Sequence, residues 1–343
     1  MSSRLPELGD ALQLRSWYDY LRQAEATMAR FAGHYVLAHF EYEHPPRLQP
    51  GTPRRMRKPY RIRVSYAAWG EPSNPTLICC GGVVNSAMRF AWLADALRHG
   101  YHVICLDWVG RGNSGWLFDE ADYSLETHVE QVRQLIAHLG DQPVKLLGSS
   151  LGGSVGIELA ARWPRLVERL ILNDIGPFIP KSRRLRRAQA LARHYVFREP
   201  ADLLRKIGAA QRNFGPAGDE VRFHLSYHQT RWSESDGGRI YRHDVRALQA
   251  YRRDAVHSLD QWGAWARVRC PVLVIHGMLS DALLPGTIGR MCKKTGLQVM
   301  HVPDTGHTPI LYDDNQIHFV RSWLDRSALA QGCWCVLHAP LIG

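Results

Sequence analysis

Residues 148–152 (GSSLG) place a serine between two glycines in the spacing G-x-S-x-G. Ser150 is the central residue. Ser149 is not, because a frame centred on it would need glycines where Leu147 and Leu151 stand. Glycines on both sides allow the backbone to turn sharply and other backbone to come close, which leaves the central hydroxyl exposed. Ser150 is therefore the candidate nucleophile.

A serine hydroxyl is a weak nucleophile unless a nearby base takes its proton, and the base works best when a carboxylate orients it. Both partners follow later in the chain. Asp281 lies in SDALLP and His307 lies in DTGHTP. We therefore expect Ser150 to attack, His307 to act as the base and Asp281 to orient His307.

Short apolar runs alternate with amphipathic stretches from residue 61 onward, a pattern typical of parallel strands joined by helices. The predicted strands are 61–69, 76–80, 103–106, 144–147, 169–173, 271–277 and 297–303. Several are continuously apolar, as strands covered on both faces should be, so we predict a mostly parallel sheet flanked by helices. Ser150 precedes a predicted helix over 153–163, while Asp281 and His307 follow strands. All three should meet at the crevice beyond the strand ends.

The same pattern divides the chain into four parts. The first part, 1–59, contains an amphipathic helix over 11–37 and a Pro/Arg-rich linker. The core consists of 60–176 and 256–326, and a helical cap over 177–255 is inserted into it. A C-terminal tail covers 327–343. The tail has no predicted role in the sheet.

Four stretches together resemble the α/β-hydrolase superfamily, most closely its capped, serine esterase-like members. They are DWVGRGNS (107–114), GSSLGG (148–153), SDALLP (280–285) and DTGHTP (304–309). The resemblance covers about residues 60–325 and implies an α/β-hydrolase fold, a triad of Ser150, Asp281 and His307, and acyl-enzyme chemistry. Asp174 is the alternative acid, because some members of the superfamily use an acid at the end of the preceding strand.

The oxyanion hole is predicted to consist of the backbone N–H groups of Leu151 and Gly82, with Val83 as the alternative to Gly82. The chain departs from many relatives here. It has Cys80-Gly81-Gly82 where they have His-Gly, and Ser149 where they have histidine between the first glycine and the nucleophile. Because these changes alter the surroundings of the nucleophile, the sequence leaves the preferred substrate open.

These features predict a cofactor-free serine hydrolase that cleaves carboxylic esters of small molecules. Two other readings stay open. One is an acyltransferase or carbon-carbon bond hydrolase with the same triad, and the other is a non-catalytic ligand-binding protein on the same scaffold. No metal-binding spacing is found, since Cys333-x-Cys335 lacks a second ligand pair.

The composition, with 45% hydrophobic and 22% charged residues over 343 positions, is that of a folded protein. No secretory signal or long apolar run is seen, so we expect a soluble cytoplasmic protein with reduced cysteines. The net charge of +11 is concentrated in residues 47–63 and 181–187. Neither segment is interleaved with stacking aromatics, so no specific nucleic-acid binding is expected. Electrostatic contact with an anionic surface stays open, and nothing indicates an oligomeric state.

Overall fold

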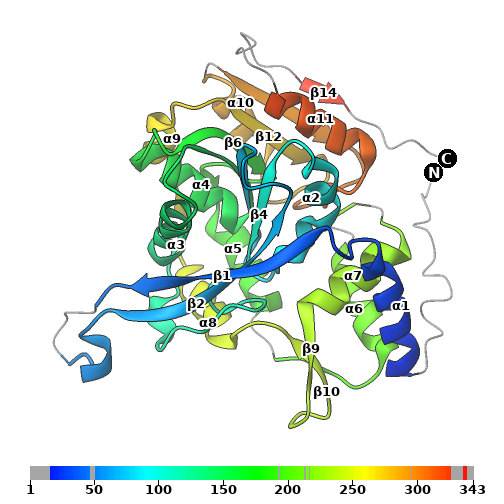
Figure 1. Ribbon diagram of the computed structural model, residues 1–343. Coiled ribbons are helices and arrows are strands. Elements are labelled where there is room, and N and C mark those ends of the chain that lie inside the picture. The colour runs from blue at the N-terminus through cyan, green and yellow to red at the C-terminus, as the bar shows by residue number, and fades with distance from the viewer. Residues whose placement is uncertain are drawn as a thin grey trace.

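The computed structural model describes residues 16–46, 51–191, 194–211, 214–215, 217–294, 296–325 and 335–337. Its centre is a nine-stranded sheet in the order β1-β2-β4-β3-β5-β6-β12-β13-β14 (Figure 1). The strands are β1 (Tyr35–His44), β2 (Tyr60–Trp69), β3 (Thr76–Cys80), β4 (His102–Leu106), β5 (Val144–Ser149), β6 (Val167–Asn173), β12 (Val272–Gly277), β13 (Leu297–Val302) and β14 (Cys335–Leu337). β2 is antiparallel to both of its neighbours, and the other pairs are parallel. The predicted mostly parallel sheet is confirmed.

Helices cover both faces of the sheet. The helices of the core are α2 (Ala91–Leu97), α3 (Leu125–His138), α4 (Leu151–Arg162), α9 (Trp262–Arg267), α10 (Pro285–Met291) and α11 (Asp314–Asp325), with short 3-10 turns η2 (Arg54–Met56), η3 (Ala87–Phe90) and η4 (Glu120–Asp122). Strand β3 shows how coverage on both faces restricts the residue types of a strand. Leu77 and Cys79 belong to the apolar cluster with α2 and α11, whereas Ile78 and Cys80 belong to the cluster with α3 and α4. Because successive residues on a strand point to opposite faces, both positions must be apolar.

The segment between β6 and β12 forms a cap outside the central sheet. It contains β7 (Phe178–Ile179), α5 (Lys181–Leu191), β8 (Val196–Phe197), α6 (Pro200–Gln211), α7 (Asp219–Gln229), β9 (Thr230–Ser233), β10 (Gly238–Tyr241) and α8 (Val245–Asp254), followed by β11 (Leu259–Asp260). β7 pairs with β11, so the chain leaves and re-enters the core at one place. The predicted helical cap also contains strands, because β8, β10 and β9 form a small antiparallel sheet.

The N-terminal part differs from its prediction. Helix α1 is Trp17–Ala29, capped by the Ser16 side chain, and the predicted helix over 11–37 is too long because residues from Tyr35 onward form β1. The first residues of the predicted helix, 11–15, lie outside the described residues. β1 pairs with β2 along all ten of its residues. α1 lies against α7 of the cap (Figure 1), where Tyr20 and Ser226 share a hydrogen bond of 2.8 Å.

The C-terminal part also differs from its prediction. Residues 335–337 form β14, which pairs in parallel with β13 and ends the sheet, so this part of the tail does have a role in the sheet. The rest of the predicted tail lies outside the described residues. In the part of the chain that the structure describes, no helix combines the length and the apolar character needed to cross a bilayer.

Candidate active site

Ser150 occupies a strained turn between β5 and α4. Its backbone has φ 51° and ψ −110°, a conformation that costs a non-glycine residue about 1–3 kcal/mol. The flanking glycines make the turn possible. A Cβ at Gly148 would lie 2.3 Å from the backbone of Gly152, and one at Gly152 would lie 2.2 Å from the carbonyl oxygen of Cys80. The G-x-S-x-G spacing is therefore a steric requirement of this turn.

Replacing Gly148 with alanine is expected to lower the free energy of unfolding by about 3 kcal/mol, because the new methyl group would overlap backbone atoms that cannot move independently. Gly289 in α10 is the matched control, since nothing lies within 4 Å of a Cβ built there. Gly289→Ala should raise stability by up to about 1 kcal/mol. Urea denaturation measures both, and equal effects of the two substitutions would contradict this account of the turn.

His307 contacts Ser150 and is brought there by the loop after β13. Its Nε2 lies 3.1 Å from Ser150 Oγ, and its Nδ1 lies 2.8 Å from Asp174 Oδ2. A carboxylate can only accept, so Nδ1 carries the proton and Nε2 is left to accept from the serine hydroxyl. This is the tautomer that a general base for Ser150 requires. The structure thus brings together the predicted serine and histidine.

Asp174, at the end of β6, holds the position predicted for Asp281. Its backbone has φ 56°, and its side chain is completely buried. One carboxylate oxygen accepts the N–H of Gly277 at 3.0 Å. The other accepts the hydroxyl of Ser280 as well as the His307 N–H. Three donors therefore fix the carboxylate that orients His307.

Asp281 does not hydrogen-bond to His307, and its predicted place as the orienting acid is wrong in this geometry. Its side chain is 58% exposed and pairs with Arg183 at 3.2 Å and Arg186 at 3.3 Å, both from α5 of the cap. Although partial burial acts to raise it, the pKa of Asp281 is lowered by these two arginines. The physical reason is that the loop after β12 carries Asp281 out toward the cap, while the buried end of β6 faces His307.

The pKa of His307 is lowered below its ordinary value of 6.5, chiefly by burial. The hydrogen bond to Asp174 acts in the opposite direction, and the positive charges of Arg183 and Arg187 act with burial. A base must be neutral to accept a proton, so a lowered pKa keeps His307 competent across neutral pH.

The pH dependence of kcat/KM on an uncharged ester should therefore be flat above about pH 7 and fall on the acid side with a midpoint below the ordinary histidine pKa of about 6.5. The sign follows from protonation, because lowering the pH through the pKa converts His307 to a cation that cannot accept the Ser150 proton. A steady-state pH profile measures the midpoint. A midpoint above about pH 7 would contradict this environment for His307.

The loop after β3 lies beside Ser150, but only part of the predicted oxyanion hole is available. A Cβ at Gly82 would lie 3.5 Å from that of Ser150. However, the Gly82 N–H donates to Asn85 Oδ1 at 2.9 Å, so it is already used and the prediction for Gly82 is wrong. Within the described part of the chain, the N–H groups of Leu151 and Val83 have no acceptor. These two are the predicted donors whose N–H groups are not already used.

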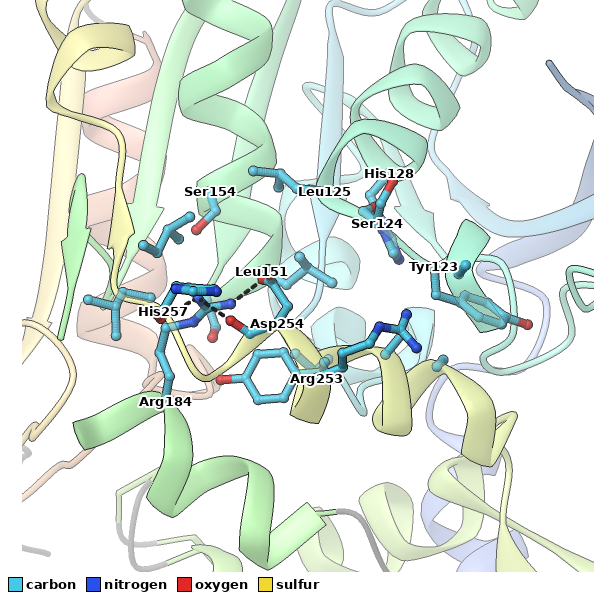
Figure 2. Close-up of a pocket in the computed structure, with 18 of the residues that line it drawn as sticks. Tyr123, Ser124, Leu125, His128, Leu151, Ser154, Arg184, Arg253, Asp254 and His257 are labelled. Carbon is cyan, nitrogen blue, oxygen red and sulfur yellow. Dashed lines mark hydrogen bonds and ion pairs between the residues drawn. The ribbon is translucent and has the colours of Figure 1, made fainter. Parts of the chain in front are cut away.

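A cavity of 540 Å³ opens at Ser150 between the core and the cap. Figure 2 shows Arg184, Asp254 and His257 at one end of it and Tyr123 and His128 at the other. Arg184 pairs with Asp254 there. Burial lowers the pKa of His128 to about 3, so this histidine is neutral. Much of the remaining lining is aliphatic, from Val83, Leu125, Leu151, Ile179, Ala247, Ala250 and Leu259. The cavity can therefore take a largely apolar group next to the serine.

Three residues that support the site were not singled out from the sequence. Arg89, completely buried in η3, donates to the backbone oxygen of Thr308 at 2.6 Å and so holds the loop that carries His307. Asn173 donates to Ser149 Oγ and to the oxygen of Pro309, at 2.8 and 2.9 Å. Asn85 fixes the loop after β3. No local signal marks them, because their partners lie far away in the sequence.

No group of three or more His, Cys, Asp or Glu side chains is arranged to hold a metal ion in the described ranges. Asp107, which follows β4, has a local structural role. Its carboxylate accepts the N–H groups of Ala87 at 2.6 Å and Asn113 at 2.9 Å, and burial raises its pKa to about 6. Asp107 thus joins two loops near the site without contacting the serine or the histidine.

Comparison with known proteins places the chain in a family. The profile of the alpha/beta hydrolase fold matches residues 75–314, more than half of the chain, and the chain belongs to this family. It is 31% identical over 267 residues to a 3-hydroxybutyrate-oligomer hydrolase of Cupriavidus necator, covering 74% of this chain and 90% of that protein. It is also 30% identical over 119 residues to a human serine hydrolase-like protein, covering 35% of this chain and 59% of that one.

Solved structures show the same fold. A putative hydrolase from Rickettsia typhi superposes with a TM-score of 0.77 at 23% identity, covering 85% of this chain and all of that one. An alpha/beta hydrolase from Novosphingobium aromaticivorans gives a TM-score of 0.70, also at 23% identity, over 85% of this chain and 98% of that one. These structural similarities confirm the fold. The family match and the Cupriavidus necator relative confirm the resemblance stated from the sequence motifs and support a hydrolase of this family.

Proposed function

We propose that the protein is a serine hydrolase that cleaves carboxylic esters through an acyl-enzyme. The observation that carries this proposal is the hydrogen-bonded series from Ser150 Oγ to His307 Nε2 and from His307 Nδ1 to Asp174. The strained backbone at Ser150 supports it independently, because the strain holds the hydroxyl at the mouth of a cavity. A nucleophile, a base and an orienting acid are the three groups that acyl transfer needs.

In the proposed reaction, Ser150 Oγ attacks the ester carbonyl carbon as its proton passes to His307 Nε2. The N–H groups of Leu151 and Val83 would donate to the oxyanion, a contribution of about 3–4 kcal/mol per donor in measured cases. Collapse of the tetrahedral species breaks the bond to the alcohol, which takes the proton from His307. Water then attacks the acyl group with the same base, and Ser150 is released. Asp174 stays ionised and stabilises the histidine cation in both steps.

The relatives support ester hydrolysis over the alternatives. The name of the Cupriavidus necator relative refers to an oligomer of a hydroxy acid, whose units are joined by ester bonds. The same triad would equally serve acyl transfer or carbon-carbon bond hydrolysis, and these stay as second candidates. A non-catalytic ligand-binding role is disfavoured, because such a role gives no reason to maintain a costly backbone at Ser150.

The test uses p-nitrophenyl esters from acetate to dodecanoate, with product analysis in the presence and absence of a competing alcohol. The proposal predicts release of the free acid as the main product, with a preference set by the cavity beside Ser150. A new ester as the main product would favour acyl transfer instead. Absence of turnover on every ester of the series, together with tight retention of an ester, would favour the binding role.

A further inference from the structure

A second cavity, of 270 Å³, lies beside the loop after β3. Val83 lines the first cavity, whereas the next two residues, Val84 and Asn85, line the second. The other walls come from the cap and include Arg187 of α5 and Lys206 of α6. The loop that carries the predicted oxyanion donor therefore also lines a neighbouring space whose other walls come from the cap.

The second cavity carries positive charge without an internal counter-ion. Arg187 and Lys206 line it, and no Asp or Glu does among the described residues. His243, which also lines it, adds no charge at neutral pH, because burial lowers its pKa to about 4. Tyr241 remains a hydrogen-bond donor, because burial raises its pKa to about 12. A cation and a hydroxyl donor on one wall are the groups that bind an anion.

Arg187 differs from the other arginines of α5. Arg183 and Arg186 share the carboxylate of Asp281, and Arg184 pairs with Asp254. Within the described part of the chain, Arg187 has no hydrogen-bonded or ion-paired carboxylate, although it is largely buried. Burial and the charge of Arg183 lower the pKa of Arg187, whereas the charges of Tyr251, Asp281 and Tyr241 act to raise it. A largely buried cation without a direct ion pair is unfavourable by itself and is stabilised further when an anion binds beside it.

The position of Arg187 places the second cavity next to the reaction centre. The two cavities adjoin on α5 as well as at the loop after β3, because Arg184, one turn before Arg187, lines the first cavity. Asn85, from the shared wall, holds Gly82 against Ser150. Lys206 of α6 is an exposed residue that also lines the cavity, with its Nζ 3.1 Å from Tyr195 Oη. A substrate with its ester at Ser150 and an anionic end a few bonds away would place that end beside Arg187.

We propose that the second cavity binds the carboxylate end of an ester substrate, with Arg187 as its counter-ion and Lys206 at the cavity mouth. The substrate class is therefore an ester that also carries a free carboxylate. The carboxylate could belong to either the acyl or the alcohol part, and both share the chemistry that Arg187 recognises. This inference rests on the proposed ester hydrolysis, and its test includes a binding measurement that needs no turnover.

The kinetic test compares each anionic ester with its neutral amide. Monoethyl glutarate against ethyl glutaramate puts the charge on the acyl part, and 3-acetoxypropanoate against 3-acetoxypropanamide puts it on the alcohol part. Wild-type protein should prefer the carboxylate in kcat/KM for one of the two pairs, and the pair shows which part enters the cavity. Arg187→Gln should reduce that preference by at least about tenfold, the value of one charge-assisted hydrogen bond.

Two further variants separate recognition from folding. Arg186→Gln removes a cation from the same helix that lies outside the cavity and should leave the preference unchanged. Arg187→Lys keeps the charge and should retain part of the preference. Covalent labelling of Ser150 by a fluorophosphonate reports whether the serine centre of each variant is intact. No preference for either carboxylate in wild-type protein, or an equal loss in Arg186→Gln and Arg187→Gln, would overturn the proposal.

Calorimetry on Ser150→Ala protein keeps this inference distinct from the proposed function. The four esters are titrated into Ser150→Ala and into the double variant that also carries Arg187→Gln. We expect one carboxylate to bind at least about tenfold more tightly than its amide, and the difference to be lost in the double variant. Equal affinities for acid and amide would overturn the carboxylate site even if esters are hydrolysed. A difference that is present in Ser150→Ala and lost in the double variant supports the site even if no ester is hydrolysed, whereas a difference that persists in the double variant would overturn the role of Arg187.

Discussion

A Ser150→Ala variant is expected to hydrolyse esters with kcat reduced by about 10⁶-fold, the loss seen when the nucleophile of another serine hydrolase is removed. The reason is that no other hydroxyl lies at this turn with its oxygen 3.1 Å from the neutral nitrogen of a histidine. Only residual catalysis by the backbone donors and by substrate binding should remain. Initial rates on a p-nitrophenyl ester of the preferred chain length measure the effect.

Ser149→Ala is the matched control for this prediction. Ser149 is the neighbouring residue, but its hydroxyl is completely buried and accepts a hydrogen bond from Asn173 at 2.8 Å. Its loss should change kcat by less than about tenfold, because it affects only the support of the loop that carries His307. Comparable losses in Ser149→Ala and Ser150→Ala would contradict the assignment of the nucleophile.

An Asp174→Asn variant is expected to lose about 10⁴-fold in kcat with its fold intact, as in the equivalent substitution of another triad. The amide that replaces the carboxylate can donate to His307 Nδ1, so the ring would adopt the tautomer with its proton on Nε2. That nitrogen could then no longer accept from Ser150. The negative charge that stabilises the histidine cation would also be lost.

Asp281→Asn provides the comparison that decides between the two acids. Its carboxylate is largely exposed and pairs with Arg183 and Arg186 instead of His307. Removal of its charge should change kcat by less than about tenfold, because an exposed ion pair contributes little. If Asp281→Asn caused the large loss and Asp174→Asn the small one, the acid predicted from the sequence would be correct and the geometry described for His307 would not be the catalytic one.

The nucleophile and the base were predictable because each depends on a short pattern. The glycines around Ser150 are a local steric requirement, and His307 follows a strand, β13, in which four of six residues are apolar. The acid was harder to predict, because Asp174 and Asp281 both follow strands whose carboxyl ends meet at one crevice. Only the three-dimensional paths of the two loops decide which carboxylate reaches the ring. Asp174 points inward from the end of β6, and Asp281 is drawn outward by arginines of the cap.

The oxyanion donor was mispredicted for a similar reason. Gly82 has the required position beside Ser150, but its N–H is taken by the side chain of Asn85 three residues later. Sequence alone does not show the rotamer that makes this contact. Val83, the alternative from the sequence, donates to no acceptor in the described part of the chain and stays the proposed donor of this loop.

The sheet was predictable where its strands are buried on both faces and less so at its edges. β3 is apolar after its first residue, and β5 contains the apolar run Leu146-Leu147 and is buried at every position. β1 is an edge strand in which exposed and buried residues mix, and its first residues continue the helical spacing of the segment before it. β14 has only three residues and is a strand of the sheet only through its pairing with β13. Edge strands depend on pairing with a distant partner, which a local pattern cannot reveal.

The most direct test of the triad is covalent labelling of the wild-type protein with a fluorophosphonate, followed by mass spectrometry of its peptides. A fluorophosphonate reacts with a serine only where a base removes its proton and donors stabilise the oxyanion, so it needs no knowledge of the substrate. We predict one adduct per chain, on Ser150, formed more slowly below the pKa of His307. No adduct, or an adduct on another residue while Ser150 stays unmodified, would contradict the central claim.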